Sequence, residues 1–184
     1  ETAVYVYAAS FHGKKLLALG GNSGNPIFDW FIGRELNPRI GEFDIKTFNE
    51  LRPGLILWAL LDISCVCHQY TKFGWVSDSI VLVTLFHVWY IVDSLINEST
   101  ILTQMDITTD GFGFMLSVGD LAWLPFTYCL QARFLAFHPI HLGWLGVLAI
   151  LAVQFTGYYI FRVANLEKNE FRHGRNPKGT YAMR

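Results

Sequence analysis

The chain has 184 residues, of which 52% are hydrophobic, 16% aromatic and only 16% charged. Because a soluble domain usually carries about 25% charged residues, this composition and a mean hydropathy of +0.32 point away from a water-soluble globule. The net charge of −1 gives no sign of a nucleic-acid partner in this segment, and three cysteines exclude a fully paired disulfide scaffold.

The first apolar piece, Val4–Phe11, resembles the end of an earlier membrane span. Since the chain begins at Glu1 and shows no signal-peptide pattern, we expect it to be a piece of a longer protein. The segment that follows, residues 12–53, is rich in Lys and Arg and is predicted to be a cytoplasmic loop.

Four later runs approach the length of a membrane-spanning helix, which needs about 20 mostly apolar residues. A soluble helical domain is the alternative, but it would have to bury all four runs in a small core. The third run is expected to kink at Pro125. The predicted fold class is therefore an all-α, polytopic transmembrane helical bundle. Its spans are Gly54–Tyr70, Ser79–Asn97, Phe112–Leu130 and Gly143–Val163.

Charged and aromatic residues near the spans indicate their orientation. The outer segments 12–53 and 164–184 are rich in Lys and Arg, whereas residues 71–78 and the 131–142 connection each hold one. Both outer segments are therefore predicted to be cytoplasmic, with the 98–111 connection on the same side. Trp and Tyr residues near the span ends, including Tyr158, fit an interfacial role.

Polar residues recur inside two predicted spans. In the second span, His87, Tyr90, Asp93 and Asn97 are three, three and four residues apart, which predicts one polar helical face. In the third, a polar seam is predicted to run from the cytoplasmic mouth into the bilayer. Ionisable groups at that depth are costly and are candidates for function, with helix–helix hydrogen bonding as the alternative. The seam comprises Asp106, Asp110, Gly113, Ser117, Asp120, Thr127 and Gln131.

Tyr90, Asp93 and Asp120 are the predicted catalytic residues. Burial makes a carboxylic acid keep its proton near neutral pH, so that it can donate it, and Tyr90 would donate directly or relay a proton from Asp93. Asp62 stands alone on its helix and is interpreted as structural. Aromatic rings such as Phe112 and Trp123 could face a flat apolar substrate, with ordinary packing as the alternative.

Lys168 and Arg172 lie just past the fourth span, four residues apart, and share a helical face. Two cations at that spacing can bind a phosphate group, for which a 2′-phosphorylated dinucleotide and lipid headgroups are alternatives. The sequence has no Gly-x-Gly-x-x-Gly turn of a Rossmann domain. No two of its six His are four residues apart, so no metal site is predicted.

Three long stretches carry a family resemblance: GNPIFDWFIGRELNPRIGEFDIKTFNELRPG (Gly24–Gly54), LTQMDITTDGFGFMLSVGDLAWLPFTYCLQARFL (Leu102–Leu135) and NLEKNEFR (Asn165–Arg172). They resemble the sterol reductases of the endoplasmic reticulum membrane, and most closely the Δ14-sterol reductase branch, which includes the C-terminal domain of lamin B receptor. The TTDGFGFML sequence and the NES stretch after Asp93 favour this branch over the related Δ7- and Δ24(28)-reductases.

The resemblance implies a many-span domain that reduces a sterol double bond with NADPH, the cofactor entering from the cytosol. It implies that Asn165, Lys168 and Arg172 belong to the NADPH site and that Tyr90 lies where sterol and nicotinamide meet. Because the family's sequence continues past the equivalent of Arg184, this chain alone is expected to be inactive. The residues expected to line or approach the substrate pocket are Glu98, Asp106, Asp110, Phe112 and Trp123.

The predicted reaction reduces the C14=C15 bond of an intermediate in ergosterol- or cholesterol-type sterol biosynthesis. A buried acid protonates C15, which leaves a tertiary cation at C14 that accepts hydride from NADPH. The predicted partners are the sterol substrate, membrane lipid and other sterol-biosynthesis enzymes. The alternatives are a Δ7- or Δ24(28)-reductase, a catalytically incomplete fragment, a lamin-B-receptor-like binding protein and a transporter that uses the acidic seam as a proton path.

Overall fold

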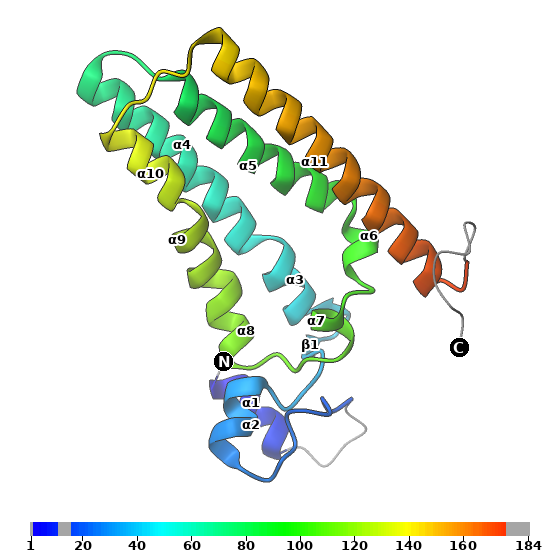
Figure 1. Ribbon diagram of the computed structural model, residues 1–184. Coiled ribbons are helices and arrows are strands. Elements are labelled where there is room, and N and C mark those ends of the chain that lie inside the picture. The colour runs from blue at the N-terminus through cyan, green and yellow to red at the C-terminus, as the bar shows by residue number, and fades with distance from the viewer. Residues whose placement is uncertain (1, 11–15, 176–184) are drawn as a thin grey trace.

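The computed structural model describes residues 2–10 and 16–175. Helix α5 lies between α4 and α11, and the shorter helices α8 to α10 run along the other side of α4 (Figure 1). Helices α1 and α2 lie at one end of this bundle. The elements are α1 (Thr2–Ser10), α2 (Pro26–Ile32), β1 (Arg39–Ile40), β2 (Phe43–Asp44), α3 (Ile45–Leu51), α4 (Pro53–Phe73), α5 (Asp78–Ile96), α6 (Glu98–Ile101), α7 (Met105–Thr108), α8 (Phe114–Val118), the π-helical turn η1 (Gly119–Trp123), α9 (Leu124–Tyr128), α10 (Leu130–Phe137) and α11 (Gly143–Arg172).

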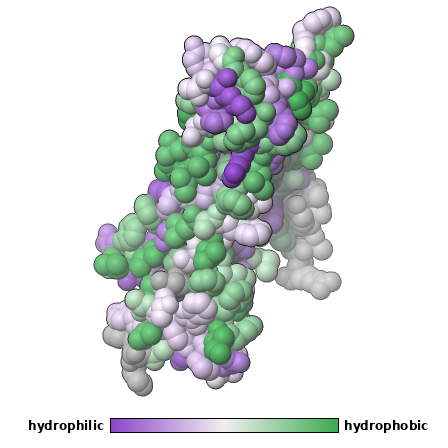
Figure 2. Space-filling view, turned by 90° about the vertical axis from the view of Figure 1, so that its left-hand side faces the viewer, coloured by the Kyte–Doolittle hydropathy of each residue, from purple (hydrophilic) through white to green (hydrophobic). Residues whose placement is uncertain are grey.

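Three described helical stretches are long and apolar enough to cross a membrane: Ile45–Phe73, Asp78–Ile96 and Gly143–Arg172. They confirm the predicted all-α membrane bundle. The first, second and fourth predicted spans lie within these helices, apart from Asn97 at the end of the second, and the helix of the fourth continues to Arg172. Many apolar side chains face outward, so that hydrophobic residues cover much of the surface seen in Figure 2. The predicted helix at Val4–Phe11 is present as α1, except that Phe11 lies outside the described residues.

The third predicted span differs from the expectation of one helix over Phe112–Leu130. Helix α8 is followed by the π-helical turn η1, and Pro125 stands in the first turn of α9. Proline has no backbone N–H to donate to the preceding turn. The turn before Pro125 is a π-helical turn, which is wider than an α-helical one, instead of a simple bend at the proline. The predicted 131–142 connection is also wrong, because residues up to Phe137 belong to α10.

The first half of the predicted polar seam is wrong as well, because its residues do not share a helix. Asp106 lies in α7, whereas Asp110 lies in the irregular stretch before α8. That stretch packs backbone to backbone against Gly33, where a Cβ on Gly113 would overlap the backbone nitrogen of Gly33. The stretch before α8 therefore packs closely through its glycines and does not form the helical turns that the spacing predicted.

Helix α4 forms the centre of the packed core. Leu55 and Trp58 pack with Ile91 of α5 and Cys129, which follows α9. At the start of α4, a Cβ on Gly54 would overlap the carbonyl oxygen of Asp120, so glycine permits η1 to approach this closely. By contrast, no residue of α11 is buried.

Candidate active site

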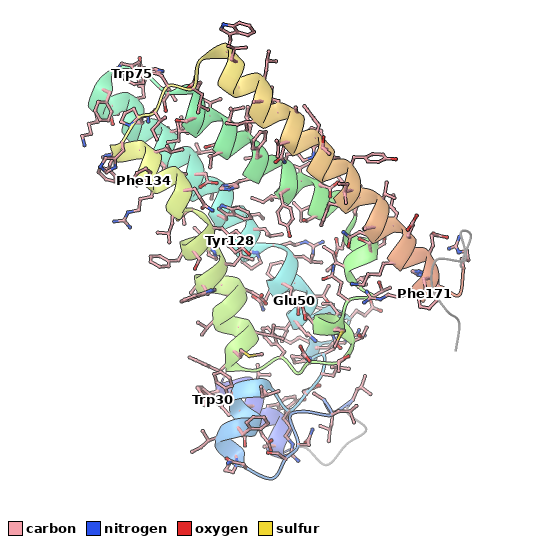
Figure 3. All side chains as sticks on the ribbon, in the orientation of Figure 1. Trp30, Glu50, Trp75, Tyr128, Phe134 and Phe171 are labelled. Atoms are coloured by element: carbon pink, nitrogen blue, oxygen red, sulfur yellow. The ribbon has the colours of Figure 1, made fainter. Side chains whose placement is uncertain are left out.

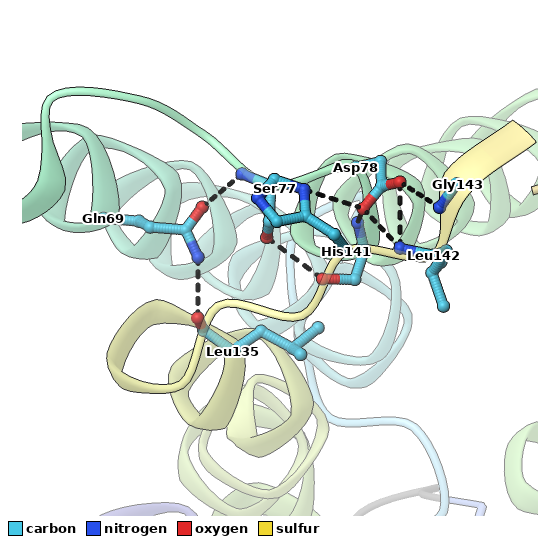
Figure 4. A network of polar contacts seen from close by, with 8 residues as sticks. Gln69, Ser77, Asp78, Leu135, His141, Leu142 and Gly143 are labelled. Carbon is cyan, nitrogen blue, oxygen red and sulfur yellow. Dashed lines mark hydrogen bonds and ion pairs between the residues drawn. The ribbon is translucent and has the colours of Figure 1, made fainter.

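Asp78, the first residue of α5, holds the start of α11. Its carboxylate accepts hydrogen bonds from the backbone N–H of Leu142, at 3.0 and 3.1 Å, and from that of Gly143, at 3.1 Å (Figure 4). Beside it, the buried Gln69 donates to the carbonyl of Leu135 and accepts from the N–H of Ser77, both at 2.7 Å. A carboxylate at a helix N-terminus satisfies otherwise unpaired N–H groups. This Asp78 contact fixes where α11 begins relative to α5.

Asp93 joins α5 to α11 a second time, farther along both helices. Its carboxylate accepts from the Tyr158 hydroxyl at 2.9 Å, the Arg162 guanidinium at 3.2 Å and the Asn97 amide at 3.1 Å. The side chains of Asp93 and Arg162 are only 12% and 17% exposed. Three donors, one of them a cation, surround this carboxylate, which is the arrangement of charge-assisted hydrogen bonds. The role of Asp93 as a proton source stays a prediction. We call this the Asp93 network.

A cavity of about 210 Å³ opens beside the Asp93 network, between α5 and α11. Its walls are largely aromatic: the rings of Trp89 and Tyr158 meet edge to face at 5.5 Å, and those of Tyr90 and Phe161 lie 6.5 Å apart. Tyr90, expected in the substrate pocket, therefore does line a cavity, together with Asp93. The full lining is Phe86, Trp89, Tyr90, Asp93, Gln154, Gly157, Tyr158 and Phe161.

His87 was predicted on one face with Tyr90, Asp93 and Asn97, but it does not line this cavity. Tyr90 lies between the two sides of α5, because its ring and that of His87 both pack against Trp58 of α4, at 5.9 and 4.6 Å. Its Nδ1 lies 2.7 Å from the carboxylate of the fully buried Asp62 on α4. Three residues turn an α-helix by about 300°, which is about 60° less than a full turn. Polar side chains spaced three residues apart on α5 therefore point progressively away from α4 and toward α11. Asp62 is therefore paired between helices, in keeping with its structural interpretation.

Asp120 belongs to a different polar group from Asp93. One oxygen of its carboxylate is buried and has no hydrogen-bond partner among the described residues, and Asp106 and Lys46 are the charges beside it. Lys46 is fully buried and donates to the carbonyl oxygens of Ile107, at 3.1 Å, and Asp110. Glu50 of α3 lies in the same end of the bundle (Figure 3). The two predicted catalytic aspartates thus lie in separate groups.

The predicted substrate-pocket residues do not line the α5–α11 cavity either. Glu98 forms a two-point ion pair with Arg52, at 2.8 and 3.2 Å. Phe112 is buried at 4% exposure, whereas Trp123 is 65% exposed. Asp106 is exposed and Asp110 half-buried. Their contact with a substrate stays a prediction.

The predicted cofactor residues all lie on the last turns of α11. Lys168 is exposed and forms no hydrogen bond or ion pair with the part of the chain that the structure describes. The guanidinium of Arg172 makes a long contact, 3.4 Å, with the Thr103 hydroxyl. Asn165 donates to the carbonyl of Phe161 at 2.8 Å. The two cations are thus available to an anion at this end of the helix.

Sequence reasoning missed three residues of this helix as site members. Tyr158 and Arg162 complete the Asp93 network, and Asn169 has a buried side-chain oxygen without a hydrogen-bond partner among the described residues. The signal available was the four-residue spacing of Tyr158 and Arg162, which matches that of Asp93 and Asn97 on α5.

The chain is similar in sequence to curated Delta(14)-sterol reductases. The chain is 65% identical over 173 residues to the Delta(14)-sterol reductase erg24 of Schizosaccharomyces pombe, covering 94% of this chain and 41% of the relative. It is 56% identical over 184 residues to Delta(14)-sterol reductase ERG24 of Saccharomyces cerevisiae, covering 94% and 42%. The chain spans about two fifths of the length of these curated relatives. Residues 1–183 match the ergosterol biosynthesis ERG4/ERG24 family, and the chain belongs to that family.

Proposed function

We propose that this chain is part of an NADPH-dependent Δ14-sterol reductase of the endoplasmic reticulum membrane. The observation that carries the proposal is the α5–α11 cavity, whose aromatic walls end in the Asp93 network. The same helix, α11, carries Lys168 and Arg172 at its far end. The α5–α11 cavity is apolar with a polar end, which suits a sterol. The two cations on the same helix suit a phosphate-bearing cofactor that reacts with it.

The substrate assignment rests on the shape and chemistry of the cavity walls. Phe86, Trp89 and Phe161 offer flat apolar surfaces to a rigid ring system. Aromatic faces also attract positive charge, which develops when an alkene is protonated. The relatives named as Delta(14)-sterol reductases support the C14=C15 bond as the site of reduction.

Proton transfer must come first, because an isolated alkene accepts hydride poorly. We assign the donor role to Tyr90, whose ring lines the cavity and whose hydroxyl forms no hydrogen bond with the described residues, whereas the Tyr158 hydroxyl is held by Asp93. The O–H bond of Tyr90 breaks as a C15–H bond forms, and C14 becomes a tertiary cation. The charged Asp93 stabilises this cation electrostatically, and Tyr90 later regains a proton from water.

Two residues of α11 fit the phosphate end of NADPH. Lys168 and Arg172 are exposed cations. When bound, NADPH supplies the hydride that C14 accepts. The chain's own task at this end is to hold the 2′-phosphate by charge-assisted hydrogen bonds.

Sterol profiling of a yeast strain that lacks Δ14-sterol reductase tests the function. The full-length gene product should restore C14-reduced sterols, and Tyr90→Phe should lower the rate about 10²–10⁴-fold, as expected for loss of a general acid. Tyr70→Phe is the matched control, because Tyr70 is 59% exposed and lies on α4, outside the cavity. Reduction at another double bond would contradict the function. Full activity of Tyr90→Phe would instead move the donor role to Asp120, tested by Asp120→Asn.

Steady-state kinetics of the purified full-length enzyme test the cofactor site. Lys168→Gln and Arg172→Gln should each raise KM for NADPH about tenfold or more, because a hydrogen bond to a charged group contributes about 1.5–3 kcal/mol. KM for NADH, which lacks the 2′-phosphate, should not change. If the cations only contact lipid headgroups, neither KM will move.

A further inference from the structure

A larger cavity, of about 590 Å³, lies between α4 and the stretch from η1 to α10. No residue of α5 or α11 lines it, so it is separate from the candidate active site. Most of its wall is apolar. We call it the α4–α10 groove and define it by Leu57, Leu61, Leu121, Phe126, Ala136 and Phe137.

Cationic side chains gather at the end of the groove where α4 and α10 finish. Arg133 lines it, is exposed, and its guanidinium forms no hydrogen bond or ion pair with residues 2–10 or 16–175. Lys72 holds its ammonium 4.9 Å from the ring centre of Phe137, which belongs to the groove wall. The ring of His68 lies 4.9 Å from that same ring. No Asp or Glu is among the lining residues.

The position of these charges matters because α4 is long and apolar enough to cross a membrane and α10 packs against it. Arg133 is one helical turn before the end of α10 at Phe137, and Lys72 is one residue before the end of α4 at Phe73. Long basic side chains at such positions extend to the bilayer surface and meet lipid phosphates there. Figure 2, which views the molecule from the side of α8 to α10 and α4, shows hydrophilic side chains gathered in the upper part of a largely hydrophobic face.

We propose that the α4–α10 groove binds an anionic phospholipid, with one acyl chain along the apolar wall and the headgroup at Arg133 and Lys72. The planar guanidinium matches two oxygens of a phosphate. An apolar wall of this volume accepts a chain that water would not stabilise. A sterol offers only one hydroxyl, which leaves both cations without a countercharge, so the charges favour the phospholipid.

Native mass spectrometry tests whether the two cations select the lipid headgroup. The full-length protein is first equilibrated with equal amounts of phosphatidylserine and phosphatidylcholine. One cation near an anionic lipid surface contributes about a fivefold preference, so the protein should retain phosphatidylserine about 25-fold better. Arg133→Gln with Lys72→Gln should abolish that preference. Arg133→Lys should keep most of it, because the charge remains.

A second variant tests the groove without changing charge. Ala122 is exposed and lines the groove, so Ala122→Trp should fill it and reduce the retention of phosphatidylserine. Leu145→Trp, at a residue 64% exposed on α11, is the matched control and should leave retention unchanged. Circular dichroism and a thermal unfolding curve confirm that both variants are folded before lipid is measured.

Four outcomes would overturn the proposal. Equal retention of phosphatidylserine and phosphatidylcholine would show that the cations do not select the headgroup. If inorganic phosphate displaced the lipid and the Ala122→Trp variant still retained phosphatidylserine fully, the cations would form a simple anion site. Preferential retention of ergosterol, or of no lipid at all in the full-length protein, would show that a sterol or another protein segment occupies the groove.

Discussion

Helices α4 and α11 are both long and apolar, yet they are held in place by different forces. Helix α4 buries Gly54, Leu55, Trp58, Asp62 and Gln69, whereas α11 has no buried residue along its 30 positions. The position of α4 follows from packing on two sides. The position of α11 depends on the Asp78 contact and the Asp93 network, both polar. The candidate site therefore lies on the side of the molecule where a few hydrogen bonds decide the geometry.

The largest expected effect is the loss of the cation in the Asp93 network. Arg162→Gln leaves the mostly buried Asp93 carboxylate without its countercharge, which should lower the free energy of unfolding by about 3–5 kcal/mol. Unfolding of the detergent-solubilised protein, followed by circular dichroism, measures the change. The matched control is Arg39→Gln, because Arg39 pairs with Asp44 while 60% exposed, and its loss should cost at most about 1 kcal/mol.

The double variant Asp93→Asn with Arg162→Gln completes this test. Removing the charge as well as its partner should restore much of the lost stability, because no uncompensated carboxylate remains. A double variant as unstable as Arg162→Gln would mean that packing rather than charge holds α11, and the contrast with α4 would fail.

A smaller loss is expected on the packed side of the molecule. Gly54→Ala forces a Cβ against the carbonyl oxygen of Asp120, and overpacking of this kind costs about 1–3 kcal/mol. Gly119→Ala is the control, since nothing lies within 4 Å of its Cβ position. There, the better helix propensity of alanine should add up to about 1 kcal/mol. Equal melting temperatures for the two variants would argue against close contact between α4 and η1.

Loss of the Asp78 contact should act locally. Asp78→Ala removes the acceptor for the N–H groups of Leu142 and Gly143, so the first turn of α11 should exchange its amide hydrogens faster. Hydrogen–deuterium exchange with peptide resolution measures this. The end of α11 near Arg172 should exchange as before, since the Asp93 network remains; a uniform increase along the helix would mean that the two attachments are not independent.

The smallest effect concerns Asp29, outside the spans. Burial raises the pKa of its carboxyl, but hydrogen bonds from Ser23 and Gly24 and the charge of Arg34 hold it below the ordinary value of 3.8. Its ionised form therefore stabilises the fold above that value, and the contribution disappears as the pH falls through the lower folded pKa. The difference in melting temperature between wild type and Asp29→Asn should be constant down to about pH 5 and shrink below pH 4. A difference that persists unchanged in acid would contradict this assignment.

The length of the apolar runs was enough to predict the three long helices, because about 20 continuous apolar residues are typical of a membrane-spanning helix. It failed for the third, where a π-helical turn stands before Pro125. The close approach of Gly54 to this turn joins segments far apart in the sequence, which no local pattern reveals. The face shared by Lys168 and Arg172 followed from spacing within one helix. The pairing of Asp93 with Tyr158 did not, because it joins residues 65 positions apart on two helices.

The unbroken course of α11 has a mechanical consequence. Tyr158 and Arg172 are separated by 14 residues of continuous helix, a distance of about 21 Å at 1.5 Å per residue. Because the helix is continuous and has no buried residue, a displacement at Arg172 would be transmitted along it to Tyr158. A ligand that draws Arg172 away from Thr103 would also tilt the tyrosine beside the aromatic hollow. An anion bound at Lys168 and Arg172 would thereby change the position of the Tyr158 ring in the wall of the α5–α11 cavity.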